Sequence, residues 1–197
     1  MTPGVVRVGD TVRRPVTQAS LFVARLLGHL ERRGYAGAPR HLGLDAAGRD
    51  TFSYLPGEVP ARFRRWTDAQ VAAAGALLRS LHDATRGCVL AGACPVVCHH
   101  DPGPNNAVFR DGLPYAFIDF DTAAPGDPLE DVGYALCKRK VCPSVLCLRG
   151  RQARHLSCAP AALPPFSPAV RRGYGSRQDR LRGRSARTPH HEARAGS

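Results

Sequence analysis

The sequence lacks a hydrophobic run long enough to cross a membrane. No apolar stretch reaches the roughly 18 residues that a transmembrane helix needs. The start, Met1-Thr2-Pro3-Gly4, has no basic region followed by an apolar one, so it does not predict a secretory signal. The seven cysteines show no disulfide-framework spacing. We therefore expect reduced thiols and a cytoplasmic protein.

Lysine is absent from the first 136 residues, and the net charge is unevenly distributed. In residues 1–136, 14 arginines balance 14 acidic residues. In residues 137–197, 14 basic residues, including Lys138 and Lys140, face only Asp179 and Glu192. The formal charge of +12 therefore belongs to the last third of the chain. A neutral segment is followed by one of different composition.

Periodic apolar patterns fade beyond residue 136, where Arg, Pro, Ser, Gly and Cys dominate. One interpretation is a disordered or irregular basic tail. The other is a segment translated out of frame from a GC-rich gene. We favour the second, because the change falls inside an apparent helix that begins at Pro128 rather than at a linker.

The first 136 residues predict alternating strands and helices. Residues 5–8 and 11–13 form two strands joined at Gly9-Asp10. From Ala19, apolar residues recur at helical spacing up to a stop at Gly34. Further elements are predicted as strands at residues 41–45, 50–55, 107–109 and 115–119, a helix that Thr67 and Asp68 begin, and a helix at residues 128–136.

The most informative polar residues follow the short apolar segment Val96-Val97. His99, Asp101 and Asn106 have the spacing H-x-D-x-x-x-x-N, and Asp119 and Asp121 follow on the next strand. This is the arrangement of a kinase catalytic loop and its metal-binding strand. The Asp101 carboxylate can accept a proton from an attacking hydroxyl. The amide oxygen of Asn106 and the carboxylate of Asp119 are hard ligands that suit Mg²⁺.

Together with four other segments in the same order, this loop resembles the aminoglycoside phosphotransferase family, small-molecule kinases with a protein-kinase-like fold. The matching segments are Ser53-Tyr-Leu-Pro-Gly57 as the interlobe hinge, Leu77-Leu-Arg-Ser-Leu81-His82 as the helix ending in L-H, the loop His99 to Asn106, Phe117-Ile118-Asp119-Phe120-Asp121 as the metal strand, and Pro125-Gly126-Asp127-Pro128-Leu129-x-Asp131. The resemblance covers about two-thirds of the chain.

The resemblance implies a role for each matching residue. Asp101 would be the catalytic base, and His99 would hold the catalytic loop by hydrogen bonding. Asn106 and Asp119 would hold magnesium on the nucleotide phosphates. Two sets of nucleotide contacts are also implied, from Arg13, in place of the usual strand lysine, and from Tyr54 in the hinge.

The resemblance further implies an α+β, protein-kinase-like two-lobe fold, although incomplete. Residues 1–57 would form a partial nucleotide-binding lobe and residues 58–136 a partial catalytic lobe, with residues 137–197 as the basic tail. Three features depart from the family. The glycine-rich loop is missing between the first two strands, Val23-Ala24 stand where a glutamate partner of the cation is usual, and the basic tail replaces the closing helices.

The predicted activity is ATP- or GTP-dependent, Mg²⁺-dependent phosphorylation of a hydroxyl group on a small molecule. The expected partners are the nucleotide and its acceptor, with no membrane. A truncated, inactive kinase remnant is the alternative. A nucleic-acid-binding tail is a third hypothesis, which the shortage of interleaved aromatics disfavours. Cys94, Cys98 and His99 suggest zinc ligands, but without a C-x-x-C pair we expect no structural metal there.

Overall fold

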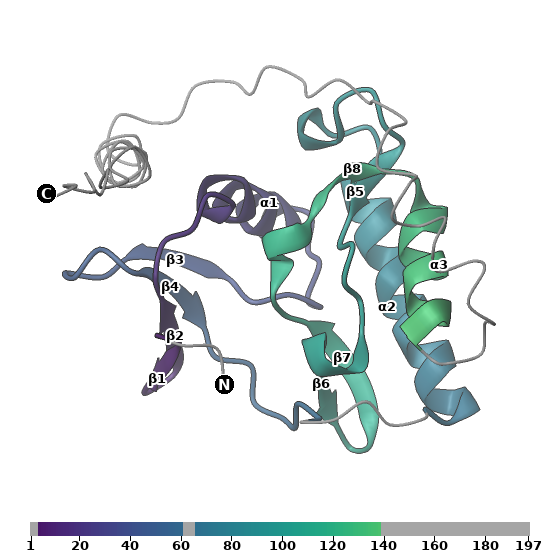
Figure 1. Ribbon diagram of the computed structural model, residues 1–197, viewed down its shortest axis with the longest axis horizontal. Helices are drawn as coiled ribbons and strands as arrows, with labels where there is room; N and C mark the ends of the chain where they lie inside the picture. The colour runs from purple at the N-terminus through teal and green to yellow at the C-terminus, as the bar shows by residue number, and fades with distance from the viewer. Residues whose placement is uncertain (1–3, 61–65, 139–197) are drawn as a thin grey trace, which may run out of the picture. The chain divides into compact units, whose positions relative to one another are not determined.

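The computed structural model describes residues 4–60 and 66–138 (Figure 1). All of these residues belong to one compact unit, Met1–Pro164. The basic segment lies outside the described residues from 139 onward, and the out-of-frame interpretation stays a prediction. The structure combines helices and short antiparallel sheets, which confirms the predicted α+β class.

A four-stranded antiparallel sheet forms the first part of the chain. Its strands are β1 (Val6–Val8), β2 (Thr11–Arg14), β3 (His41–Leu44) and β4 (Asp50–Ser53), in the spatial order β1-β2-β4-β3. The predicted hairpin turn at Gly9 has φ of 56°, which glycine adopts without strain. Both predicted strand pairs are therefore confirmed. Strand β1 begins one residue later than predicted, β2 ends one residue later, and β3 and β4 end one and two residues earlier.

Helix α1 (Ser20–Arg32) connects the two hairpins of this sheet. Its buried side chains recur at the spacing of one helical face: Ser20, Val23, Leu26, Leu27 and Leu30. The chain leaves the helix through Gly34, at φ of 73°. The helix predicted from the apolar periodicity is confirmed.

The second part of the chain is built from two helices and two small sheets. These elements are helix α2 (Asp68–Thr85), strand β5 (Val96–Cys98) paired with β8 (Ala124–Gly126), the hairpin of β6 (Ala107–Arg110) and β7 (Leu113–Phe117), and helix α3 (Pro128–Lys138). Helix α2 begins with a capping box in which Thr67 and Gln70 bond reciprocally. Helices α2 and α3 lie side by side (Figure 1).

Three short 3-10 turns complete these elements: η1 (Val89–Ala91), η2 (Pro104–Asn106) and η3 (Phe120–Thr122). The sequence pattern did not indicate β8, whose three residues pair with β5 from a distant part of the chain. Strand β7 ends at Phe117, two residues earlier than predicted. Asp119 therefore lies in a turn rather than on a strand.

One hydrophobic cluster joins the first sheet to the second part of the chain. It contains the buried face of α1, Phe52 of β4, Leu78 and Leu81 of α2, and the aromatic residues Phe109 and Phe117 of the β6–β7 hairpin. The backbones of Glu58 and Phe109 exchange two hydrogen bonds, of 3.0 and 2.8 Å. In the part of the chain that the structure describes, no helix combines the length and hydrophobicity of a membrane span.

Candidate active site

The catalytic loop runs from β5 to β6, and its two predicted polar residues are hydrogen-bonded to each other. The Asn106 side-chain amide donates to the Asp101 carboxylate at 2.8 Å and to the Asp101 carbonyl at 3.0 Å. Asn106 is held in the short turn η2 and is 4% exposed. Because the amide nitrogen is directed at Asp101, the amide oxygen faces another direction, where Asn105 donates to it at 3.1 Å.

His99 is fully buried and is hydrogen-bonded to the backbone through both ring nitrogens. Its Nε2–H donates to the Ile118 carbonyl at 3.1 Å, and its Nδ1 accepts from the Asp101 N–H at 3.3 Å. The ring packs on Phe120, with centroids 4.5 Å apart. Burial lowers the pKa of His99, although nearby carboxylates oppose that shift. These contacts suit a neutral imidazole that fixes the backbone of Asp101.

Asp131 at the start of α3 is a buried residue whose contribution the sequence pattern did not reveal. One carboxylate oxygen accepts from the His99 N–H at 2.9 Å, and the other accepts from the His100 N–H at 2.7 Å. His82 of α2 bonds to the first oxygen at 2.8 Å. Burial alone would raise the pKa of Asp131, but the bonds from His82, His99 and His100 lower it overall.

This carboxylate holds His100 in a backbone conformation that is uncommon for a non-glycine residue, with φ of 62°. The sequence motifs contained both His82 and Asp131, as the L-H end of a helix and the last residue of the G-D-P segment. The two residues are 49 positions apart and lie on different helices. No local signal in the sequence could therefore have shown their pairing.

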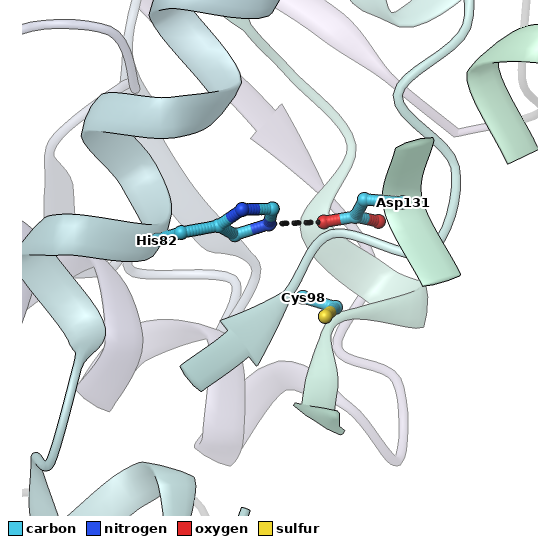
Figure 2. Close-up of side chains that lie close together, drawn as sticks. All are labelled: His82, Cys98 and Asp131. Carbon is cyan, nitrogen blue, oxygen red and sulfur yellow. Dashed lines mark hydrogen bonds and ion pairs between the residues drawn. The ribbon is translucent and has the colours of Figure 1, made fainter. Parts of the chain in front are cut away.

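Cys98 lies beside this pair, and the three side chains have the chemistry of metal ligands (Figure 2). Their ligand atoms lie within 4.8 Å of one another. However, the Asp131 oxygens already accept bonds from two backbone N–H groups and His82. Burial, followed by the charges of Asp131, Glu130 and Asp127, raises the pKa of the Cys98 thiol, so it stays protonated. We interpret this cluster as hydrogen-bonded core that supports the loop.

Asp119 follows β7 in the left-handed conformation, with φ of 62°, and the turn η3 then brings Asp121 close to it. The Ile118 N–H donates to the Asn106 carbonyl at 2.8 Å, which joins this turn to the catalytic loop. Partial burial raises the pKa of Asp119, and the charges of Asp121 and Asp101 add to that rise, whereas Arg14 opposes it. A cation close to Asp119 would relieve this repulsion.

The cation beside these carboxylates is Arg14, not the predicted Arg13. Arg14 places one guanidinium nitrogen 2.5 Å from Asp121 and the other 3.6 Å from Asp119. Arg13 instead pairs with Asp45 at 3.7 Å. Neighbouring residues of a strand point to opposite faces, so only one of the two can face the catalytic loop. The geometry therefore favours Arg14 over Arg13 as the cation of this site, and the nucleotide contact of Arg13 stays a prediction.

Tyr54 lies just after β4 and packs against the β1–β2 hairpin. Its backbone N–H donates to the Asp10 carbonyl at 2.8 Å, and the Arg7 guanidinium lies over its ring at 3.6 Å. The structure therefore joins the proposed hinge to the edge of the first sheet. Its contact with nucleotide stays a prediction.

The model of the phosphotransferase enzyme family (APH) matches residues 90–184, a segment that includes the catalytic loop, Asp119 and Asp131. Over that segment the chain is similar to this family. The resemblance inferred from the motifs is confirmed, and the matched segment extends beyond residue 136 into the basic segment.

One curated relative of this chain is the trifolitoxin immunity protein of Rhizobium leguminosarum bv. trifolii. The two are 36% identical over 137 residues, which is 61% of this chain and 52% of the relative. The chain thus spans about half the length of this curated relative.

Solved structures similar to this chain include a choline/ethanolamine kinase family protein from Mesorhizobium loti (19% identity, 74% of this chain and 64% of that one, TM-score 0.48). The macrolide 2'-phosphotransferase MphH from Brachybacterium faecium is similar at 17% identity, over 91% of this chain and 79% of that one, with a TM-score of 0.49. The aminoglycoside phosphotransferase APH(3'')-Id from Streptomyces rimosus, in complex with ADP and streptomycin, is similar at 15% identity. The match covers 87% of this chain and 90% of that one, with a TM-score of 0.46.

Proposed function

We propose that this chain transfers the γ-phosphoryl group of ATP to a hydroxyl group of a small molecule. The observation that carries the proposal is the hydrogen-bonded pair of Asp101 and Asn106, held next to Asp119. These three groups are the base and the two oxygen ligands that phosphoryl transfer needs. The match of residues 90–184 to the phosphotransferase enzyme family supports the same reaction.

In this reaction the acceptor oxygen attacks the γ-phosphorus, the bond to the β-phosphate oxygen breaks, and ADP leaves. Asp101 accepts the hydroxyl proton. Its carboxylate is oriented by Asn106 on one side, and its backbone is held by His99 Nδ1 on the other. Because phosphoryl transfer has a loose transition state, orientation and charge compensation provide most of the rate enhancement.

The residues present fit a magnesium ion. Asn106 and Asp119 offer hard oxygen ligands, and the Asp119 side chain is 52% exposed, so it can be approached from solvent. When bound, Mg²⁺ would neutralise charge on the phosphates. Burial, and after it the charge of Asp121, raises the pKa of Asp119, and a bound cation would favour its charged form. The phosphates also need a cation from the protein, and we assign that contact to Arg14.

A transfer assay tests the proposal. The full chain is incubated with γ-labelled ATP, Mg²⁺ and a panel of hydroxyl-bearing small molecules, with Asp101→Asn as the inactive variant. Loss of general-base catalysis should lower the turnover rate by about 10²- to 10⁴-fold. Asp111→Asn is the matched control, because Asp111 is exposed at a distant turn, at φ of 51°, which asparagine also adopts. Nucleotide binding without transfer to any acceptor would favour the inactive-remnant alternative.

A further inference from the structure

Helix α1 provides no carboxylate for the cation of the active site. Its single acidic residue is Glu31, near the C-terminal end, where it is half exposed and pairs with Arg40 at 3.7 Å. The face that packs toward the sheet is apolar around Val23, which is 2% exposed. A carboxylate partner for an arginine of this site therefore comes from another element of the fold.

Arg14 is held not by α1 but by a carboxylate of the turn η3. Its side chain is 14% exposed, and its guanidinium lies over the Phe52 ring, 4.9 Å from the centroid. The shortest contact of the guanidinium is with Asp121, at 2.5 Å, on the turn η3. Burial of an arginine with one close carboxylate partner orients its planar group, since the fork of N–H donors is rigid.

The two guanidinium nitrogens of Arg14 contact different carboxylates. One is bonded to Asp121, and the other is 3.6 Å from Asp119. Asp119 can thus exchange this long contact for a magnesium ion while the short bond to Asp121 persists. The nitrogen released from Asp119 is then available to a phosphate oxygen. The Nε of Arg14 is also buried without a hydrogen-bond partner among the described residues, so the donors of Arg14 are only partly used.

We propose that Asp121 is the positioning residue of the nucleotide site: it holds Arg14 for phosphate contact, in the role that a helix glutamate has in related kinases. This inference rests on the proposed function, because it assumes that ATP binds here. It assigns the two carboxylates of the Asp119-Phe120-Asp121 segment to different partners. Asp119 serves the metal and Asp121 serves the arginine.

Calorimetric titration of the full chain with ATP and Mg²⁺ tests the assignment. Asp121→Asn should raise the dissociation constant of ATP about tenfold, which corresponds to the free energy of one charge-assisted hydrogen bond. It should leave adenosine binding unchanged, because adenosine has no phosphates. Asp121→Glu, which restores the charge, should recover most of the affinity. The matched control is Asp45→Asn, which removes the partner of Arg13 on the other face of β2 and should leave ATP affinity unchanged.

A double-mutant cycle distinguishes positioning from direct metal binding. If Asp121 acts through Arg14, Asp121→Asn has no further effect on ATP affinity in the Arg14→Ala background. A persistent tenfold loss in that background identifies Asp121 as a metal ligand and overturns the inference. Equal weakening of ATP and adenosine also overturns it, because that is the effect of general structural damage. If the unaltered chain binds no nucleotide, the proposed function itself fails, and this inference fails with it.

Discussion

The buried polar residues of this site hold the predicted catalytic residue Asp101 in position. Asp101 is oriented by Asn106 and His99, and the backbone of His99 and His100 is held by Asp131. Each supporting group is within hydrogen-bond distance of the next. Loss of one buried partner would leave an unpaired polar group in the core, which costs about 1–3 kcal/mol.

His99 makes the stability of this site depend on pH. Its pKa is lowered in the folded protein, whereas in the unfolded chain it is about 6.5. The unfolded state therefore binds more protons at mildly acidic pH. The contribution of His99 to stability is present above about pH 6.5 and is lost as the pH falls toward the lowered value in the folded state.

We expect the free energy of unfolding to fall between pH 7 and pH 5, with His99 contributing up to about 1.4 kcal/mol per pH unit. Urea denaturation at several pH values measures this slope. The slope should be shallower for His99→Gln, which cannot titrate. His29→Gln provides the comparison, because His29 is only partly buried and bonds the Ala84 carbonyl of α2. Identical slopes for the His99 variant and the unaltered chain would contradict the expectation.

At the scale of elements, the link between the first sheet and the second part of the chain depends on a close backbone approach. Gly57 has φ of 153°, and a Cβ atom added there would lie 2.4 Å from the Phe109 carbonyl oxygen. The next residue, Glu58, exchanges two backbone hydrogen bonds with Phe109. Glycine is needed here both for its conformation and for the space that it leaves.

We expect Gly57→Ala to lower the free energy of unfolding by about 3 kcal/mol, since it combines an unfavourable φ with a backbone clash. Gly112→Ala is the matched control. Gly112 also has a positive φ, of 76°, but a Cβ there meets nothing within 4 Å, so we expect a loss of only about 1 kcal/mol. Chemical denaturation compares the two variants. Equal losses would show that the contact between Gly57 and Phe109 is unimportant.

For the whole molecule, the site is assembled from segments on both sides of Gly57. Arg14 comes from the first sheet, and Asp119 and Asp121 come from the turn after β7. A ligand that contacts both segments should therefore stabilise the folded chain as a unit. That stabilisation follows from preferential binding to the folded state.

We expect ATP with Mg²⁺, at about 100 times its dissociation constant, to raise the melting temperature by roughly 5–10 °C. The shift should require Mg²⁺ and should disappear in Asp119→Asn, because the ligand for the metal is then missing. Differential scanning fluorimetry measures it, with Asp111→Asn as the control. A shift that persists without Mg²⁺ and in Asp119→Asn would place nucleotide at another site.

Much of this architecture was predictable because its signals are local. The helical periodicity around Leu26 and Leu30 predicted α1, and turns at Gly9 and Gly34 marked where elements end. The spacing of Asp101 and Asn106 predicted their participation in one loop, and the structure shows them hydrogen-bonded. Strand β8 was missed because its three residues form a strand only through pairing with β5.

The sequence by itself determined the α+β class, the resemblance to the phosphotransferase family and the positions of the predicted catalytic loop, since these depend on periodicity and on short-range spacing. Only the tertiary structure decided that Arg14 rather than Arg13 faces the carboxylates, and that Asp131 holds the loop. Adjacent strand residues have equal propensities but point to opposite faces, and a contact between two helices leaves no trace in local sequence. Which side chain meets which carboxylate was therefore decided when the elements packed together.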